Sequence, residues 1–213
     1  MDLVPELDQR VSQAPASVEL SLGAERLGAD FYARPVLEVA RDLIGCVVEY
    51  EGMAGRIVET EAYHESEPAC HAFVGVTRRT QTLFGDPGIA YVYRSYGIHA
   101  LLNAVCEPAG VGAAVLIRAL EPLAGMESMR RRRGGVSDVN LCSGPGKLTQ
   151  ALGIDLSENG TSLLDGPVSI RRGDPGRARV VAGERIGITK AVDLRWRFAL
   201  ADNRHVSRPR PFA

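Results

Sequence analysis

Three segments of the chain have the apolar pattern or the end signals of a helix. Residues 35–45 place four apolar side chains on one helical face, with a proline in the first turn and a glycine after the last apolar position, which predicts an amphipathic helix. A second helix is predicted over 126–133, where Gly134-Gly135 ends it. A third begins with Ser143 as its N-cap, has Pro145 in its first turn and ends at Gly153.

Other segments alternate between apolar and polar residues, which is typical of strands. Segments 46–50 and 54–63 flank a turn at Glu51-Gly52 and form a predicted hairpin. Further strands are predicted over 89–93, 100–105, 113–120, 168–171 and 185–189, with a tight turn at 96–99 and a last apolar-aromatic segment at 196–200. No repeat or linker interrupts this order, so the pattern predicts one α+β domain on a mostly antiparallel sheet.

The first 28 residues differ from the rest because they mix Pro, Ser, Ala and Glu without sustained periodicity. We expect a loosely ordered N-terminal segment over 1–28, with at most one short helix around residues 17–22, and a folded domain over 29–213.

Composition agrees with a globular domain, since 45% of the 213 residues are hydrophobic and 24% are charged. There is no apolar run of membrane-spanning length and no basic, then apolar, N-terminus, so neither membrane insertion nor export is expected. The four cysteines contain no C-x-x-C pair and are expected to be reduced thiols in the core. The predicted location is the cytosol, or the nucleus of a eukaryote.

Charge is distributed unevenly, although the formal net charge is only −1. Residues 1–70 hold 5 arginines against 14 acidic residues, whereas residues 71–213 hold 20 basic against 12 acidic residues. A basic groove in the second part would suit a polyanionic partner.

The glycine-rich segment 143–147 is not a nucleotide-hydrolysing loop. Residue 141 is leucine where the Walker motif needs glycine, and Leu148 replaces the Ser or Thr that would hold magnesium. Free amides at the start of the following helix could still hold a phosphate. A simple capping turn explains the segment equally well.

His64, Cys70 and His71 raise the alternative of a metal site. Their spacing matches no common zinc pattern, and the other two histidines stand in segments without companion ligands. We therefore expect no metal.

Two polar clusters are more informative. On an alternating strand Glu59, Glu61 and Tyr63 share one face, and tyrosines are dense over residues 91–96, close to Asn103. Aromatic faces beside a carboxylate and a basic surface are what a pocket for a nucleobase needs. A solvated strand face and ordinary core packing are the alternatives.

Several motifs, in one order along the chain, together resemble the alkyladenine (3-methyladenine) DNA glycosylases of base-excision repair. The matching residues are 40–45 (ARDLIG), 55–63 (GRIVETEAY), His71, 84–88 (FGDPG), 91–99 (YVYRSYGIH), Asn103, 116–122 (LIRALEP) and 142–152 (CSGPGKLTQAL). The resemblance implies a curved sheet with flanking helices and a protruding hairpin that inserts into DNA.

The resemblance also implies catalytic roles. Glu61 matches the general base that activates water, and Arg118 matches the arginine that supports this carboxylate. Ile186, in a shorter match, is where a backbone carbonyl also holds the water. Glu59, two positions from Glu61, is expected to matter far less to excision.

Binding roles follow in the same way. Tyr63, His71 and Tyr93 correspond to the pocket that sandwiches the extruded base. Tyr96 corresponds to the residue that fills the gap left in the duplex, and Asn103 to the side chain that disfavours guanine through its exocyclic amine.

The expected DNA-backbone contacts are Ser143, Gly144 and Lys147, next to the glycine-rich turn. The chain departs from the family where Thr80 replaces the usual asparagine and where Ala72-Phe73 follows His71 instead of a Ser-led stretch. These departures affect local loop contacts and leave the catalytic set unchanged.

The sequence thus predicts a monomeric, monofunctional glycosylase without metal, cofactor or nucleotide, which acts on alkylated or deaminated purines in double-stranded DNA and leaves an abasic site. One alternative is a catalytically silent module that binds damaged DNA. Another is a relative of the same fold directed to RNA, which would prefer single strands or 2′-hydroxyl substrates.

Overall fold

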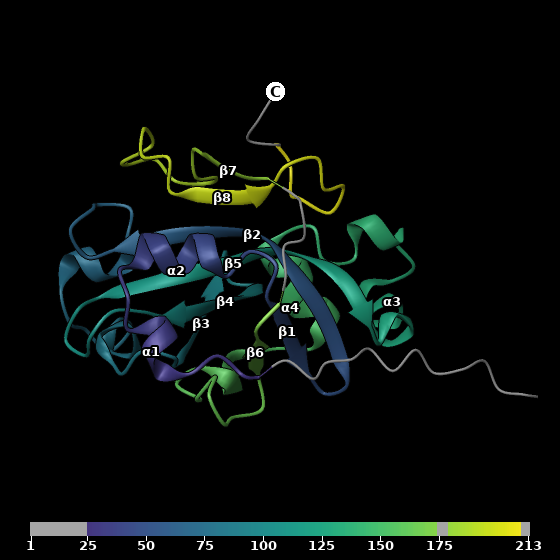
Figure 1. The fold of residues 1–213 in the computed structure, drawn as a ribbon, viewed down its shortest axis with the longest axis horizontal. Helices are drawn as coiled ribbons and strands as arrows, with labels where there is room; N and C mark the ends of the chain where they lie inside the picture. The colour runs from purple at the N-terminus through teal and green to yellow at the C-terminus, as the bar shows by residue number, and fades with distance from the viewer. Residues whose placement is uncertain (1–24, 174–178, 210–213) are drawn as a thin grey trace, which may run out of the picture.

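A computed structural model describes residues 25–173 and 179–209, whose centre is a curved antiparallel sheet (Figure 1). The strands in these ranges are β1 (Val47–Tyr50), β2 (Met53–His64), β3 (Ala90–Ser95), β4 (His99–Val105), β5 (Ala113–Ala124), β6 (Ser169–Arg171), β7 (Val180–Gly183) and β8 (Arg197–Leu200). The helices are α1 (Ala29–Tyr32), α2 (Val36–Asp42), α3 (Met126–Arg133) and α4 (Pro145–Leu152), with 3-10 turns η1 (His71–Val74), η2 (Gln81–Phe84), η3 (Asp138–Asn140) and η4 (Leu156–Glu158). The predicted α+β single domain is confirmed.

Strand β2 organises the sheet because it has three partner strands. Along one edge it pairs with β5, and along the other it pairs first with β1 and then, at residues 59–61, with β8. The β2–β5 register shifts on both sides of Glu59. Such bulges bend a strand and redirect its side chains, and they are common beside functional sites.

Helix α2 covers one face of β2. Its buried residues Val36, Val39 and Ala40 face the sheet, and the Thr60 hydroxyl donates to the Ala40 carbonyl at 2.7 Å. Since side chains alternate along a strand, Glu59 and Glu61 point to the opposite face from Thr60. The predicted shared face of the two carboxylates is confirmed.

Strands β3 and β4 are joined by the predicted tight turn. Ser95 pairs with His99 across its base, and Tyr96 and Gly97 both adopt positive φ angles, of 49° and 74°. The left-handed backbone that a right-twisted two-strand ribbon requires at its turn suits glycine and strains tyrosine. Insertion of this hairpin into DNA stays a prediction.

Two local predictions are wrong. Residues 185–189 form no strand: the backbone amide of Ile186 bonds to a side chain, and the neighbouring strand is β7, at 180–183. The N-cap of α4 is Gly144, with φ 159° and ψ 151°, and Ser143 does not cap the helix. Pro145 occupies the first helical position as predicted, because proline needs no amide partner there.

The N-terminal helix considered around residues 17–22 lies outside the described residues. The last part of the predicted lead-in, residues 25–28, lies against β6, where the Leu27 amide donates to the Ile170 carbonyl at 2.9 Å and its side chain is buried. All four cysteines are free and buried, as predicted. None of the helices in the described ranges has the length and apolar character needed to span a bilayer.

Candidate active site

A cavity of about 750 Å³ opens on the face of the sheet opposite α2. Its walls come from β2, η1, β3, β4, β5, the start of α4 and the loop that follows β7. The sequence-predicted residues that line it are Tyr63, His71, Tyr93, Tyr96, Asn103, Arg118, Gly144, Lys147 and Ile186. Residues from distant parts of the chain therefore meet in one place, as the resemblance implies.

Glu61 lies directly beneath this cavity and is fully buried. Its Oε2 accepts hydrogen bonds from the Tyr63 hydroxyl at 2.8 Å and from Arg118 Nη1 at 3.2 Å. Its Oε1 accepts one from the Ile186 backbone amide at 2.7 Å. All three donor residues line the cavity, so they form the floor between Glu61 and the space above.

These contacts define the chemistry open to Glu61. A carboxylate offers about four lone-pair positions, and three are occupied, which leaves one acceptor position on Oε1. Burial raises the pKa of Glu61, while Arg118, the Ile186 amide and the Tyr63 hydroxyl act in the opposite direction. A buried carboxylate with a raised pKa and a free lone pair is suited to accept a proton.

A second carboxylate, Glu59, lies beside the first and is also fully buried. It accepts from Arg118 Nε at 3.2 Å, from Arg197 Nε at 2.6 Å, and from both the amide and the hydroxyl of Ser207, at 2.7 and 3.0 Å. Arg118 therefore bridges two carboxylates, and the solvated strand face considered from the sequence is wrong.

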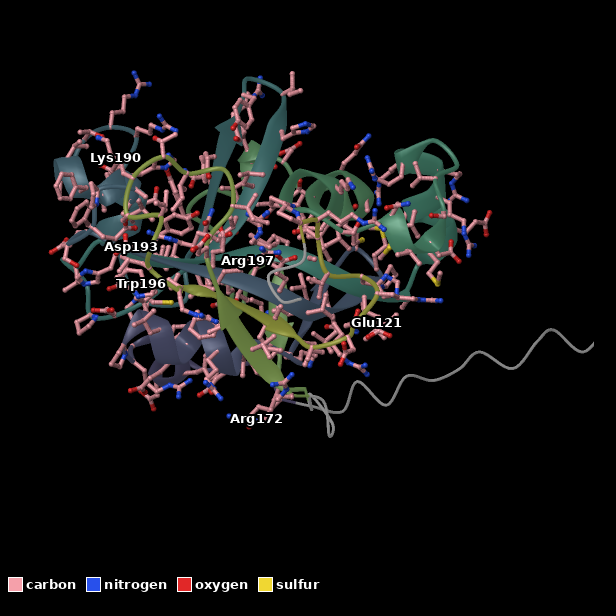
Figure 2. All side chains as sticks on the ribbon, turned by 90° about the horizontal axis from the view of Figure 1, so that it is seen from above. Glu121, Arg172, Lys190, Asp193, Trp196 and Arg197 are labelled. Atoms are coloured by element: carbon pink, nitrogen blue, oxygen red, sulfur yellow. The ribbon has the colours of Figure 1, made fainter. Side chains whose placement is uncertain are left out.

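Sequence reasoning missed Arg197 and Ser207 because they lie far along the chain from the motif they complete. Figure 2 shows Arg197 near the middle of the molecule, whereas Glu121 and Arg172 lie towards its edge. The available signal was a single arginine within the apolar segment 196–200. A charge inside a buried strand needs a partner of opposite charge.

The loop after β7 is anchored by a buried arginine. Arg185 forms two hydrogen bonds with Glu67, at 2.6 and 3.0 Å, and one with the Ala62 carbonyl at 3.0 Å. Its guanidinium lies 4.7 Å from the centroid of the Tyr63 ring and 5.3 Å from that of Trp196. Because these contacts hold the Arg185 side chain, residues 185–186 form a fixed loop and do not pair with a strand. The loop places the Ile186 amide next to Glu61.

An aromatic cluster forms the wall of the cavity. The rings of His71 and Tyr93 lie 4.6 Å apart edge to face, and those of Tyr91 and Tyr93 stack at 5.4 Å. His71 Nδ1 lies 3.1 Å from the Tyr91 hydroxyl. Burial, with a smaller contribution from Arg79, lowers the pKa of His71 to about 4, so the ring is neutral at pH 7. The core-packing alternative holds in part, because Tyr91 is buried in an apolar cluster against which Tyr63 and Tyr93 pack. Tyr63, His71 and Tyr93 also line the cavity.

Asn103 is held in one orientation at the cavity wall. Its Nδ2 donates to the carbonyls of Tyr91 at 2.9 Å and Leu101 at 3.2 Å. Because both amide hydrogens are used, the oxygen is the atom left for a ligand. Asn103 therefore presents a fixed hydrogen-bond acceptor to any molecule that binds in the cavity.

The rim of the cavity carries an aromatic tip and cationic groups. Tyr96 is 87% exposed at the end of the hairpin. Lys147 lies in the first turn of α4, with its Nζ 3.5 Å from the Ser143 hydroxyl. Lys190, which is labelled in Figure 2, lines the cavity from the loop after β7. Such a rim combines apolar contact with attraction for anions.

The metal alternative gains no support from the geometry. Within residues 25–173 and 179–209, no three His, Cys, Asp or Glu side chains are grouped to hold an ion. His64 instead contacts the hydroxyl of Ser66 at 2.7 Å and the carboxylate of Glu107 at 3.6 Å.

Comparison with known proteins shows which family and which proteins the chain is similar to. The family model for methylpurine-DNA glycosylase matches residues 30–204. A protein of Rhodopseudomonas palustris (strain ATCC BAA-98 / CGA009), named "Putative 3-methyladenine DNA glycosylase", is 55% identical over 181 residues, which cover 85% of this chain and 87% of that protein. A protein of the same name from Methanoculleus marisnigri is 50% identical over 189 residues, 85% of this chain and 98% of that one.

Proposed function

The chain belongs to the methylpurine-DNA glycosylase family and is a hydrolase that cleaves the N-glycosyl bonds of alkylated bases in DNA, and from this premise we propose that Glu61 is its general base. The buried Glu61–Arg118 pair beneath an aromatic-lined cavity is the observation that carries this proposal. Arg118 and the Tyr63 hydroxyl both donate to Oε2, and the Ile186 amide donates to Oε1, so the carboxylate is held at both oxygens.

Hydrolysis needs a water molecule aligned with the sugar. Glu61 Oε1 accepts from the Ile186 amide and has one lone pair left, and we propose that a water bound to this lone pair is also held by the Ile186 carbonyl, as the resemblance implies. The leaving base gives the sugar oxocarbenium character, which an anionic carboxylate stabilises. Glu61 would accept the water's proton as the oxygen attacks the sugar carbon and the glycosidic bond breaks.

The extruded base would stack between Tyr63 on one side and the His71–Tyr93 wall on the other. The proposed substrates are 3-methyladenine and 7-methylguanine, with hypoxanthine and ethenoadenine as further candidates. Asn103 would disfavour guanine by steric hindrance, because its side chain is held by two carbonyls and cannot move aside to make room for an exocyclic amine. Backbone groups around His71 would contact the edge of the base.

We propose that the protein acts as a monomer on double-stranded DNA. Tyr96 would occupy the gap left by the extruded nucleotide, as its exposure at the hairpin turn allows. Ser143, Gly144 and Lys147 would hold the DNA backbone at the start of α4.

A base-release assay tests the proposal. Duplex oligonucleotides carrying one lesion each are incubated with excess protein, and the released base is measured together with binding. Release under single-turnover conditions is expected for the methylated purines. Tight lesion binding without release would instead identify a silent damaged-DNA-binding module, and a preference for single strands or RNA would support the RNA-directed alternative.

The product is proposed to be an intact abasic site. Strand cleavage by a glycosylase needs an amine that forms a Schiff base with the sugar, and arginine cannot serve because it stays protonated. Lys147 and Lys190 both line the cavity, so they are the groups to test. Sodium borohydride should trap no covalent complex on lesion DNA. An adduct lost in Lys147→Ala or Lys190→Ala would replace water with that lysine as the nucleophile.

A further inference from the structure

Arg79 is a cavity residue to which the resemblance gives no role. Its Nη2 lies 3.2 Å from His71 Nε2, and its guanidinium carbon lies 5.9 Å from the centroid of the Tyr93 ring. It therefore contacts both members of the wall against which the extruded base would stack.

The hydrogen bond from Arg79 fixes the tautomer of His71. A guanidinium has only donors, so Nε2 of His71 must be the acceptor, and the proton of the neutral ring lies on Nδ1, which donates to the Tyr91 hydroxyl. Both ring nitrogens are then occupied by protein partners. The His71 ring offers a base a neutral stacking surface without a free donor.

Charge compensation separates Arg79 from the two buried arginines next to Glu61 and Tyr63. Arg118 is paired with Glu59 and Glu61, and Arg185, which packs over the Tyr63 ring and does not line the cavity, is paired with Glu67. In the described part of the chain, no carboxylate lies within ion-pair distance of Arg79. Its positive charge acts on the cavity without a fixed counterion.

Cationic and neutral damaged bases respond differently to such a charge. A cationic base gains from the electron-rich face of an aromatic ring, whereas a neutral base gains mainly from stacking area. The Arg79 guanidinium already makes a cation–π interaction with the Tyr93 ring, and its charge repels a second cation beside that ring. It lowers the advantage of a cationic base and leaves a neutral one little affected.

We propose that Arg79 is a specificity-determining residue that shifts excision away from cationic alkylated purines and towards neutral damaged purines. This inference rests on the proposed function, since it concerns the base that enters the same cavity. It gives hypoxanthine and ethenoadenine, which are neutral, a physical reason to be substrates beside 7-methylguanine, which is cationic.

The test compares one cationic and one neutral lesion in the same duplex sequence. Single-turnover excision of 7-methylguanine and of hypoxanthine is measured for the unaltered protein, Arg79→Gln and Arg79→Lys, and the ratio of the two rates is compared between proteins. For Arg79→Gln we expect the ratio to rise in favour of 7-methylguanine by about two- to fivefold, the range of a cation–π interaction at an exposed site. For Arg79→Lys, which keeps a cation that can lie over the Tyr93 ring, we expect the ratio to stay close to the original.

Arg94→Gln provides the matched control, because Arg94 also lines the cavity and follows Tyr93 on β3, but its guanidinium makes no contact with the His71 or Tyr93 ring in the described part of the chain. It should lower both rates in equal proportion, most strongly at low salt. An unchanged ratio in Arg79→Gln would overturn the proposal, and an equal, salt-dependent loss on both lesions would make Arg79 a phosphate contact. If the unaltered protein releases neither base, the proposed function fails instead.

Discussion

The floor of the cavity and the tip of its hairpin are opposites in burial and in bonding. On the floor, Glu59, Glu61 and Arg118 are at most 6% exposed, and each has several hydrogen-bond partners. At the tip, Tyr96 and Ile98 are 87% and 75% exposed. Buried charges must be paired to be tolerated, whereas exposed apolar groups add nothing to the core. Substitutions on the floor should therefore disturb chemistry, folding or both, whereas substitutions at the tip should disturb only the encounter with DNA.

The largest expected effect is on the floor. Glu61→Gln keeps the shape of the side chain but removes the group that accepts the proton, so excision should fall by about a hundredfold to ten-thousandfold. Binding of lesion DNA should be retained. Single-turnover base release and a binding titration on the same duplex measure the two properties.

Glu158→Gln is the control for that variant. Glu158 is also buried and also accepts from a tyrosine, Tyr50, but it does not line the cavity. The Glu158→Gln substitution should leave the excision rate unchanged. An excision rate for Glu61→Gln within a few-fold of the original would remove Glu61 from the role of base.

Glu59→Gln should show its effect in stability. The sequence alone suggests a mild substitution, but the structure buries Glu59 against Arg118 and Arg197, so the neutral amide leaves buried guanidinium charge unpaired. We expect a loss of about 3–5 kcal/mol in the free energy of unfolding. Denaturant unfolding measures it, with excision assayed below the lowered transition.

A pair on the surface of the same two strands provides the comparison. Arg56 and Glu121 lie 3.1 Å apart across β2 and β5, with side chains 38% and 30% exposed. Glu121→Gln should cost at most about 1 kcal/mol, since solvent screens this pair. Equal costs for the two substitutions would show that burial of Glu59 does not govern its contribution.

The same contrast explains how much the sequence can predict. The Glu59–Glu61 alternation is local, so the strand and the shared face follow from pattern alone. The strand over 113–120 is predicted in the same way, but its pairing with β2 is not. Arg197 and Ser207 complete the floor from more than a hundred residues away, and no local pattern identifies them. Residues 185–189 resemble a strand in composition, but the buried Arg185–Glu67 pair fixes them as a loop. A tertiary contact decides each of these cases.

A third prediction concerns the tip. Tyr96→Ala should leave stability unchanged, because the side chain is exposed, and should lower excision strongly for a lesion in a stable duplex. The loss should be smaller where the lesion is mispaired or bulged, since less stacking energy opposes extrusion. Ile98→Ala, at the same turn, is the control and should have the smaller effect. Equal losses on stable and mispaired duplexes would count against a role for Tyr96 in extrusion.

The smallest expected effect belongs to Tyr63, which takes part in both the floor and the cavity wall. Tyr63→Phe keeps the ring that stacks and removes the hydroxyl that donates to Glu61. That hydrogen bond lowers the pKa of Glu61, so its loss should raise this pKa further above the ordinary value. Because Glu61 acts in its ionised form, the decline of the excision rate at acid pH should move to higher pH.

At higher pH the Tyr63→Phe rate should reach a plateau within about fivefold of the original, the effect of one ordinary hydrogen bond. Tyr50→Phe removes a similar tyrosine–glutamate hydrogen bond, to Glu158, outside the cavity, so it should leave the pH profile in place. A pH profile of single-turnover excision for the two variants separates the cases. A uniform loss at every pH for Tyr63→Phe would show that the hydroxyl shapes the cavity instead of tuning Glu61, and an equal shift in Tyr50→Phe would show that the change reflects stability and not the floor of the site.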